Sequence, residues 1–344
     1  MSASVKPVLR GAEVDIAGLA YLYSRLPFLL QHFDQINRAL YLADEDSEGV
    51  PQPQYFFLEI LDKTGPLSQI SLGRLAGVDS STASSIITRL VSRHRVERSA
   101  NPADGREKLV SVTQIGRAAA ARGRSAYQRT QQTLLSGSGV ELPRFRAIVS
   151  PIAHAADSGA PAWQPELATA SARRSLGPLF ESPGFIIRRA LQHSEVAILE
   201  SIGPFDLTIR QYATLLVLNC HDPVTEADLC RLLGYDASNA ALVVNLLVEK
   251  GLAAVTNPHS NARRRYRASH AGRALLADKE PAMQGLEARL FAPVSAADAA
   301  QLKQVLARIV MKHGNSVQNP LVAFAAVFAS AHWQKPQFRV GRPR

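Results

Sequence analysis

The sequence has few cysteines and no long apolar run, and both absences narrow the class of protein. Only Cys220 and Cys230 occur, so no disulfide framework can form. The longest apolar candidate, residues 320–331, is shorter than the roughly 18 residues that a membrane span needs. The N-terminal stretch lacks the cationic start and apolar core of a signal peptide. We therefore expect a cytoplasmic protein that makes no use of a membrane.

Catalytic and metal-binding patterns are also missing from the sequence. It contains no glycine-rich loop for phosphates, and its nine histidines occur without a partnered nucleophile. The group Cys220, His221, Asp222 and Cys230 matches no common zinc spacing, and buried structural cysteines are the more common case. We expect neither an enzyme nor a bound metal or cofactor.

Composition favours a folded, basic protein. The 344 residues are enough for two domains, and 46% of them are hydrophobic. The net charge is +10, and only eight of the 39 basic residues are lysine. Arginine donates two parallel hydrogen bonds from a planar group, which suits phosphates and base edges. The charge favours nucleic acid or an anionic membrane surface as the partner.

The chain contains two copies of one pattern. Residues 28–92 align with residues 185–249 without a gap, and after one deletion Asn101-Pro102 aligns with Asn257-Pro258. The matched pairs include Tyr55/Tyr212, Leu72/Leu229, Arg74/Arg231, Gly77/Gly234, Asp79/Asp236 and Leu90/Leu247. We predict a first unit over 1–155 and a second over 181–314. Residues 156–180, rich in Ala, Pro and Ser, should link them, with or without a short helical piece, and 315–344 should form an apolar helix and a basic tail.

Each copy has the pattern of a helix–turn–helix followed by a two-stranded wing. In copy one, apolar spacing predicts helices over 28–42, 54–63, 69–77 and 81–93. Strands near 95–99 and 108–112 should follow, then helices from Thr113 to about 135 and over 143–155. Ser68 and Thr113 are predicted N-caps, and Gly77 should end its helix. The second helix of such a pair can enter the major groove of DNA.

The second helix of copy one has a packed face and an outward face. Ala83, Ile86, Ile87, Leu90 and Val91 fall on the first, whereas the second carries small hydroxyls, two arginines and no acid. An ordinary solvated face is the alternative, but such faces usually carry Glu and Lys. The DNA-binding residues predicted in copy one, wing included, are Ser80, Ser81, Thr82, Ser84, Ser85, Thr88, Arg89, Arg93, Asp104, Arg106 and Lys108.

The two wings differ in their charges. In copy one, Arg106 follows Asp104 at the tip, where an arginine can enter the minor groove, although a plain turn is the alternative reading. Copy two has lost the outward arginines of its second helix. Its predicted DNA-binding residues are Ser238, Asn239 and Asn245 on the helix and Arg263, Arg264 and Arg265 in the wing. We expect copy two to hold phosphates and copy one to read sequence better.

Residues 72–120 resemble the MarR family of multiple-antibiotic-resistance-type regulators. The stretch has that family's order of helix, recognition helix, strand, N-P-x-D-x-R wing, strand and T-x-x-G-R helix start. Copy two matches through LCRLLGYDASNAALVVNLLVEKGLAA and SHAGRALL. The resemblance implies a mainly α fold with small β wings: two winged helix-turn-helix domains whose long helices interlock into an intramolecular pseudo-dimer. It also implies a double-stranded DNA operator with unequal half-sites about one helical turn apart.

The same resemblance implies a repressor that a small aromatic or phenolic effector releases from DNA. The candidate effector-binding residues are Tyr21, Tyr23, His32, Tyr55, Arg189, His193 and Tyr212. Taken one by one, each of these residues is better interpreted as part of the packed core. The alternative for the whole chain is a ligand- or protein-binding module of this fold that has lost operator binding. The final RVGRPR is similar to an AT-hook, but Val340 breaks the pattern, and a disordered basic end is the favoured interpretation.

Overall fold

The computed structural model describes residues 15–102, 107–154, 161–202, 207–257, 263–318 and 320–334. These residues form two compact units. Unit 1 contains the chain up to His32 together with the chain from Ser194 onward, and unit 2 contains Phe33–His193. Both boundaries fall within helices, α2 (Leu26–Ala43) and α9 (Pro183–Ile202), which contribute residues to both units. In the described part of the chain no helix is long and apolar enough to cross a membrane.

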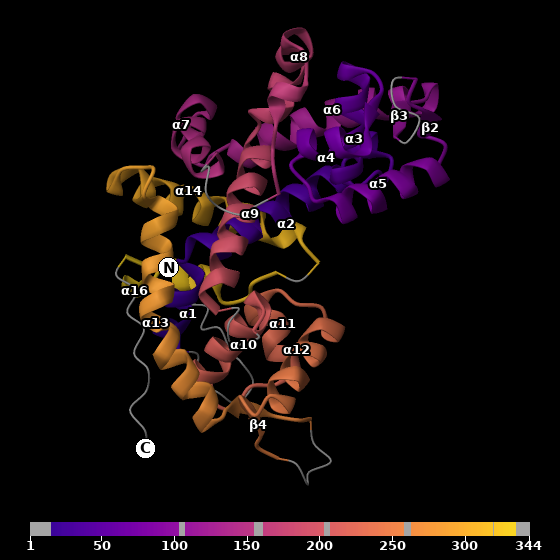
Figure 1. Ribbon diagram of the computed structural model, residues 1–344. Coiled ribbons are helices and arrows are strands. Elements are labelled where there is room, and N and C mark those ends of the chain that lie inside the picture. Colours follow the sequence, from indigo (N-terminus) through magenta and orange to yellow (C-terminus); the bar gives the residue numbers. More distant parts are fainter. Residues whose placement is uncertain are drawn as a thin grey trace. The chain divides into compact units, whose positions relative to one another are not determined.

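Unit 2 holds the helix–turn–helix and wing of copy one (Figure 1). Its elements between α2 and α9 are η1 (Glu45–Ser47), α3 (Gln52–Thr64), β1 (Leu67–Ser68), α4 (Gln69–Ala76), α5 (Ser80–Ser92), β2 (Val96–Ala100), β3 (Lys108–Val112), α6 (Gln114–Leu135), α7 (Leu142–Ala153), η2 (Pro165–Leu167) and α8 (Ala170–Phe180).

The predicted helix ends of copy one are confirmed. The Ser68 hydroxyl accepts the backbone N–H of Ser71 at 3.2 Å and caps α4, and Thr113 caps α6 in the same way. Gly77 follows α4 in the left-handed conformation, at φ +65°, which a residue without a β-carbon adopts at no steric cost. The chain can therefore turn sharply there and begin α5 within a few residues.

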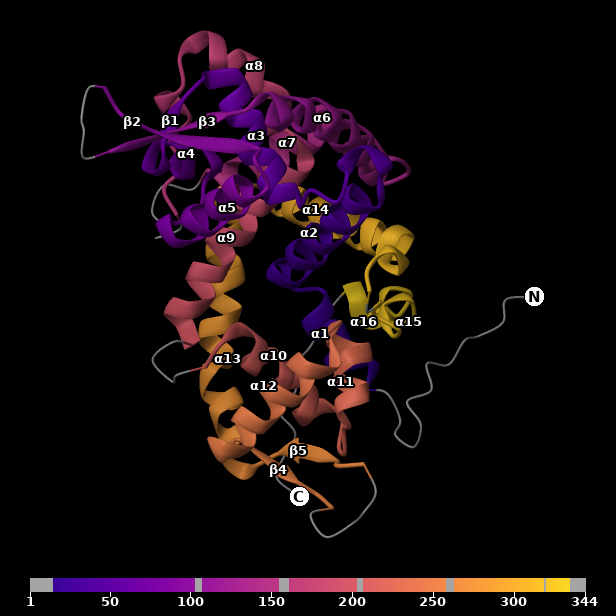
Figure 2. The ribbon, with the colours of Figure 1, turned by 90° about the vertical axis from the view of Figure 1, so that its right-hand side faces the viewer.

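The wing sheet has one strand more than the sequence predicted. Its strand order is β1-β3-β2, all antiparallel, and Figure 2 shows the three strands side by side. The short β1 pairs Leu67 with Val110 and Ser68 with Leu109. Periodicity could not predict β1, because two residues carry no pattern. Because β1 directly precedes α4, its pairing with β3 links the wing to the start of that helix.

The core of unit 2 is an aromatic cluster around α3. Tyr55 stacks on Tyr41 at 5.6 Å between ring centroids and lies 5.4 Å from Tyr127. Phe56 contacts Phe185 of α9 at 5.8 Å, and α3 also packs on α8. Helix α8 and the start of α9 belong to copy two or to the predicted linker. The core of the copy-one winged helix is therefore completed by later parts of the chain.

Unit 1 holds the helix–turn–helix and wing of copy two. Besides parts of α2 and α9, its elements are α1 (Ile16–Tyr23), α10 (Ile209–Cys220), α11 (Glu226–Leu233), α12 (Ala237–Glu249), β4 (Ala253–Val255), β5 (Tyr266–Ala268), α13 (His270–Phe291), α14 (Ala296–His313), η4 (Gly314–Ser316), α15 (Phe324–Phe328) and α16 (Ala331–Gln334). Helix α1, from the start of copy one, packs on α10, α15 and α16.

The compact units thus differ from the sequence copies. The helix that begins copy one packs with the winged helix of copy two, and the segment that begins copy two packs with the winged helix of copy one. The leading segments of the two copies carry equivalent aromatic pairs, Tyr23 with Phe28 and Phe180 with Phe185. The ring centroids lie 4.9 Å apart in the first pair, in unit 1, and 5.2 Å apart in the second, in unit 2. Helix α8 lies inside the stretch predicted as a linker.

The segment that follows each copy forms a backbone hydrogen bond at an equivalent residue of that copy's helix–turn–helix. In unit 2, the Gln164 backbone N–H donates to the carbonyl of Arg74 at 3.1 Å, and in unit 1 Val322 donates to the carbonyl of Arg231 at 3.2 Å. Arg74 and Arg231 are repeat equivalents at the ends of α4 and α11. The tail predicted as one apolar helix contains two short ones, α15 and α16. Its basic end, 335–344, lies outside the described residues.

Candidate nucleic-acid interface

Helix α5 of unit 2 presents the surface that the sequence predicted. Ala83, Ile86, Ile87 and Leu90 are buried, and Val91 is half-buried at the edge of the packed face. The outward positions are mostly exposed: Ser80, Ser81, Ser85, Thr88, Arg89 and Arg93, with Thr82 and Ser84 half-buried. Among the described residues neither arginine forms an ion pair. Both guanidinium groups can therefore meet an external acceptor.

Asp79 organises the first turn of α5. Its carboxylate accepts the Thr82 backbone N–H at 2.8 Å and the hydroxyls of Ser81 and Thr82, both at 2.6 Å. These hydrogen bonds hold the pKa of Asp79 well below its usual range. Because the two hydroxyl protons point to Asp79, Ser81 and Thr82 offer acceptors to an external partner. Phosphate contacts from this turn would have to come from other donors.

Backbone pairing in the wing of unit 2 extends to Asn101 and Glu107. Ala100 pairs with Lys108, and the Asn101 backbone N–H donates to the Glu107 carbonyl at 3.1 Å. Lys108 is exposed at the start of β3. The predicted tip residues, Asp104 and Arg106, lie outside the described residues.

Helix α12 of unit 1 repeats the architecture with different chemistry. Asp236 caps it, accepting the Asn239 backbone N–H at 2.7 Å, and hydrogen bonds from Asn239 lower the pKa of Asp236. The Asn239 amide also donates to the Asp236 carboxylate, while its oxygen accepts from Arg210 at 3.4 Å. Ser238 and Asn245 are exposed. Of the three predicted residues, Asn239 is thus engaged within the unit.

In the wing of unit 1, hydrogen bonds from the Asn257 side chain hold the backbone of the arginine segment. The Asn257 side chain accepts the Arg265 backbone N–H at 2.8 Å and donates to the Arg263 carbonyl at 3.0 Å. Arg263, Arg264 and Arg265 are all exposed. Three consecutive cations just before β5 can contact the phosphates of one backbone.

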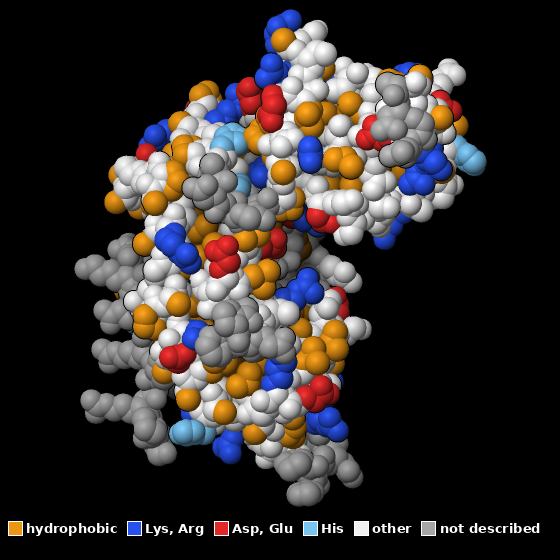
Figure 3. Space-filling model, viewed as in Figure 1, with side chains coloured by type: hydrophobic (Ala, Val, Ile, Leu, Met, Phe, Trp, Pro, Cys, Tyr) orange, Lys and Arg blue, Asp and Glu red, His pale blue; other side chains and the backbone are white. Residues whose placement is uncertain are grey.

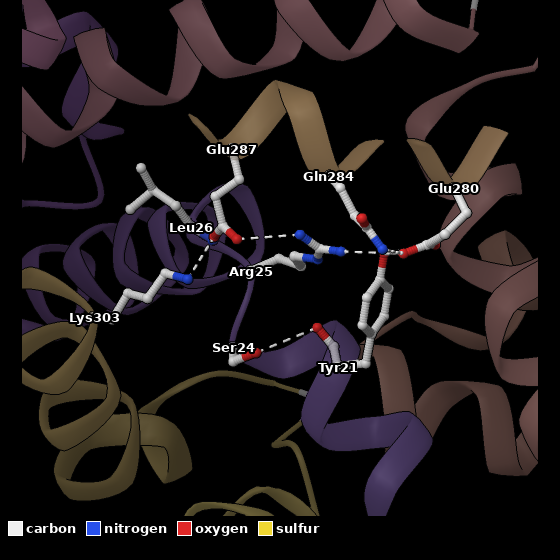
Figure 4. A network of polar contacts seen from close by, with 8 residues as sticks. All are labelled: Tyr21, Ser24, Arg25, Leu26, Glu280, Gln284, Glu287 and Lys303. Atoms are coloured by element: carbon white, nitrogen blue, oxygen red, sulfur yellow. Dashed lines mark hydrogen bonds and ion pairs between the residues drawn. The ribbon is translucent and has the colours of Figure 1, made fainter. Parts of the chain in front are cut away.

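The effector candidates of unit 1 are buried and bonded. Figure 4 shows the Tyr21 hydroxyl donating to Glu280 at 2.7 Å and Arg25 reaching Glu287 at 3.1 Å. Burial raises the pKa of Tyr21, and the nearby charge of Arg25 offsets part of that rise. Tyr23 is fully buried and donates to the Leu232 carbonyl at 2.7 Å. Sequence reasoning missed Arg25, which its four-residue spacing from Tyr21 could have suggested, and Glu280, for which the sequence gives no signal.

The remaining candidates are also buried. The His32 ring lies 4.3 Å from Phe28, and Tyr212 is 5% exposed. Tyr55 belongs to the aromatic core of unit 2. His193 contacts the Ala153 carbonyl through Nε2 at 2.8 Å, and burial and Arg189 lower its pKa.

Arg189 is the unusual member of this set. Its side chain is 5% exposed, and Nη1 donates to three neutral oxygens, those of Gln192 at 2.6 Å, Pro161 at 3.1 Å and Gly77 at 3.4 Å. In the described part of the chain no carboxylate pairs with it, and its Nε has no partner. Burial, together with Arg188, lowers its pKa to about 10. Burying a guanidinium group costs free energy, which these hydrogen bonds to neutral oxygens offset in part.

The cysteine and histidine groups assemble no metal site in the described residues, where no three potential ligands gather. Cys220 and Cys230 are free thiols. Burial raises the pKa of Cys220 to about 12, which keeps it in the unreactive thiol form.

Both units contain a helix, a turn, a recognition helix and a wing. This arrangement is that of a winged-helix DNA-binding regulator. Family models give the same result: two MarR family models match residues 50–108 and 205–265. The chain belongs to the MarR family and carries the family's module twice, and it is a transcription regulator with a winged-helix DNA-binding fold.

Three solved structures are similar to this chain. A probable transcriptional regulator from Pseudomonas aeruginosa is 32% identical, covering 36% of this chain and 91% of its own, at TM-score 0.32. Wild-type apo MarR from E. coli is 22% identical (37% and 96% covered, TM-score 0.33). A MarR family regulator from Rhodococcus sp. RHA1 is 25% identical (37% and 91% covered, TM-score 0.33). No curated protein matches the chain.

Proposed function

We propose that the chain is a repressor that binds a double-stranded DNA operator of specific sequence as a single-chain pseudo-dimer. The outward face of α5 is the observation that carries this proposal. It combines exposed hydroxyls with the guanidinium groups of Arg89 and Arg93, which form no ion pair with the residues that the structure describes, and it lies beside a wing. Arginine in a major-groove helix makes the commonest base-specific contact.

The exchange of first helices supports the pseudo-dimer. Each unit combines the winged helix of one copy with the leading segment of the other, so neither copy completes a unit alone. Copies bounded at 1–155 and 181–314 would each supply one reading head. Because the heads differ, the operator would have unequal half-sites about one helical turn apart.

Arg189 supports regulation by an effector. An anionic aromatic molecule would satisfy its buried guanidinium and draw it from the carbonyl of Gly77, the residue at which the helix–turn–helix turns. The geometry of α5 would then change, and DNA would be released. Of the seven candidates, Arg189 is the one whose charge lacks a counter-ion among the described residues.

Selection from a random duplex library, with a salt titration, tests the proposal. Wild type should enrich one asymmetric motif, whereas Arg89→Ala and Arg106→Ala should lose part of it. Arg174→Ala is the matched control, because Arg174 is also exposed but lies on α8 of unit 2. Weak, steeply salt-dependent and sequence-blind binding would contradict the proposal. It would favour the alternative of a ligand- or protein-binding module.

A further inference from the structure

The two recognition helices carry different chemistry at equivalent positions. Ser85 and Arg89 of α5 correspond to Leu242 and Leu246 of α12, and Thr88 corresponds to Asn245. Leu242 is 57% exposed, although it occupies the middle of a helix whose opposite face is packed. Single exposed leucines are common on protein surfaces, but one on the outward face of a recognition helix lies where a binding partner would contact it.

The surroundings of Leu242 favour nucleic acid as that partner. Arg263, Arg264 and Arg265 are exposed in the adjoining wing, and Figure 3 shows hydrophobic and basic side chains together where Figure 1 places α12 and the wing below it. Cations beside an apolar helix complement a groove whose floor is made of bases and whose edges are phosphates. A protein partner with an acidic rim is the other occupant, and the test below separates the two.

The base edge that suits an apolar side chain in the major groove is the C5-methyl group of thymine. Asn245 lies three residues after Leu242, so the two share one face of α12. An asparagine amide can bind adenine N6 and N7 with two hydrogen bonds. Leu242 and Asn245 together therefore match A·T pairs.

Helix α5 matches a different base. Arg89 is exposed, without an ion pair in the described part of the chain, and can bind guanine O6 and N7 with both arms of its guanidinium. Its α12 equivalent, Leu246, is half-buried and offers no donor. The guanine preference of one helix is thus absent from the other.

We propose that the two reading heads recognise half-sites of different composition: α5 a half-site containing guanine, and α12 a half-site of A·T pairs contacted by Leu242 and Asn245. This inference rests on the proposed operator binding. It assigns α12 a reading role, whereas the sequence indicated mainly phosphate contacts for copy two.

Base analogues in the selected operator test the assignment with the full chain. Replacing thymine by deoxyuridine in the A·T half-site removes only methyl groups and should weaken wild-type binding roughly fivefold or more. Leu242→Ser should bind both duplexes equally. Leu199→Ser is the matched control, since Leu199 is a 46% exposed leucine of the same unit, on α9. It should keep the wild-type response.

The other half-site is tested with 7-deazaguanine, which lacks the N7 acceptor. This analogue should weaken wild-type binding but leave Arg89→Ala unaffected. An operator that tolerates deoxyuridine, with Leu242→Ser binding as wild type does, would overturn the inference while leaving operator binding intact, and would favour a protein partner at α12. Failure to select any operator would instead overturn the proposed function.

Discussion

Replacing Gly77 by alanine should destabilise unit 2 by more than its backbone conformation explains. Gly77 has φ +65°, a region that costs an L-residue about 1–2 kcal/mol. An added β-carbon would also lie 3.0 Å from Nη1 of Arg189 and 3.1 Å from its Cδ. Displacing that guanidinium loses hydrogen bonds of a charged group, worth roughly 1.5–3 kcal/mol. The free energy of unfolding should fall by about 3 kcal/mol.

Gly49→Ala supplies the matched control. Gly49 belongs to the same unit and has φ +64°, but nothing lies within 4 Å of an added β-carbon, so only the backbone strain of about 1–2 kcal/mol should remain. Urea unfolding in a Trp333→Phe background, where Trp163 is the sole tryptophan, reports on unit 2. Equal losses in the two variants would refute the contribution of Arg189.

Two smaller changes test the cap and the effector. Asp79→Ala should lower the free energy of unfolding by about 1 kcal/mol at pH 7. Because the folded pKa of Asp79 is depressed, its contribution is present at neutral pH and diminishes as the pH falls below about 4, so the urea midpoints of variant and wild type should converge in acid. Benzoate should change Trp163 fluorescence in the single-tryptophan background and weaken operator binding. Arg189→Met should abolish both responses, and an undiminished response would place the anion elsewhere.

The winged-helix elements were predictable because their signals are local. Ser68, Thr113 and the Gly77 turn each depend on side chains or backbone conformations within a few residues, and all three appear where the sequence predicted them. Helix α8 was anticipated only as a short helical piece within a linker, since its alanine, serine and proline are typical of linkers. Its helical state depends on Leu176 and Leu179, which are buried in unit 2.

The candidate site was harder to predict because its contacts join distant residues. Arg189 meets Gly77 across more than a hundred positions, and Tyr21 meets Glu280 across more than two hundred. No periodic pattern carries such pairings. The sequence named Tyr23 and Tyr55 for their type, but only the fold places both rings in well-packed cores.

The exchange of leading helices has a consequence for synthesis. The residues of α1 emerge from the ribosome well before their packing partners in α10, α15 and α16 are made. At ordinary elongation rates that interval is on the order of tens of seconds, during which Tyr23 and the apolar face of α1 have no native surface to cover them. Unit 2 can meanwhile close once α9 has emerged. The order of translation therefore favours unit 2 as the first to fold and exposes α1 to chaperones in the interim.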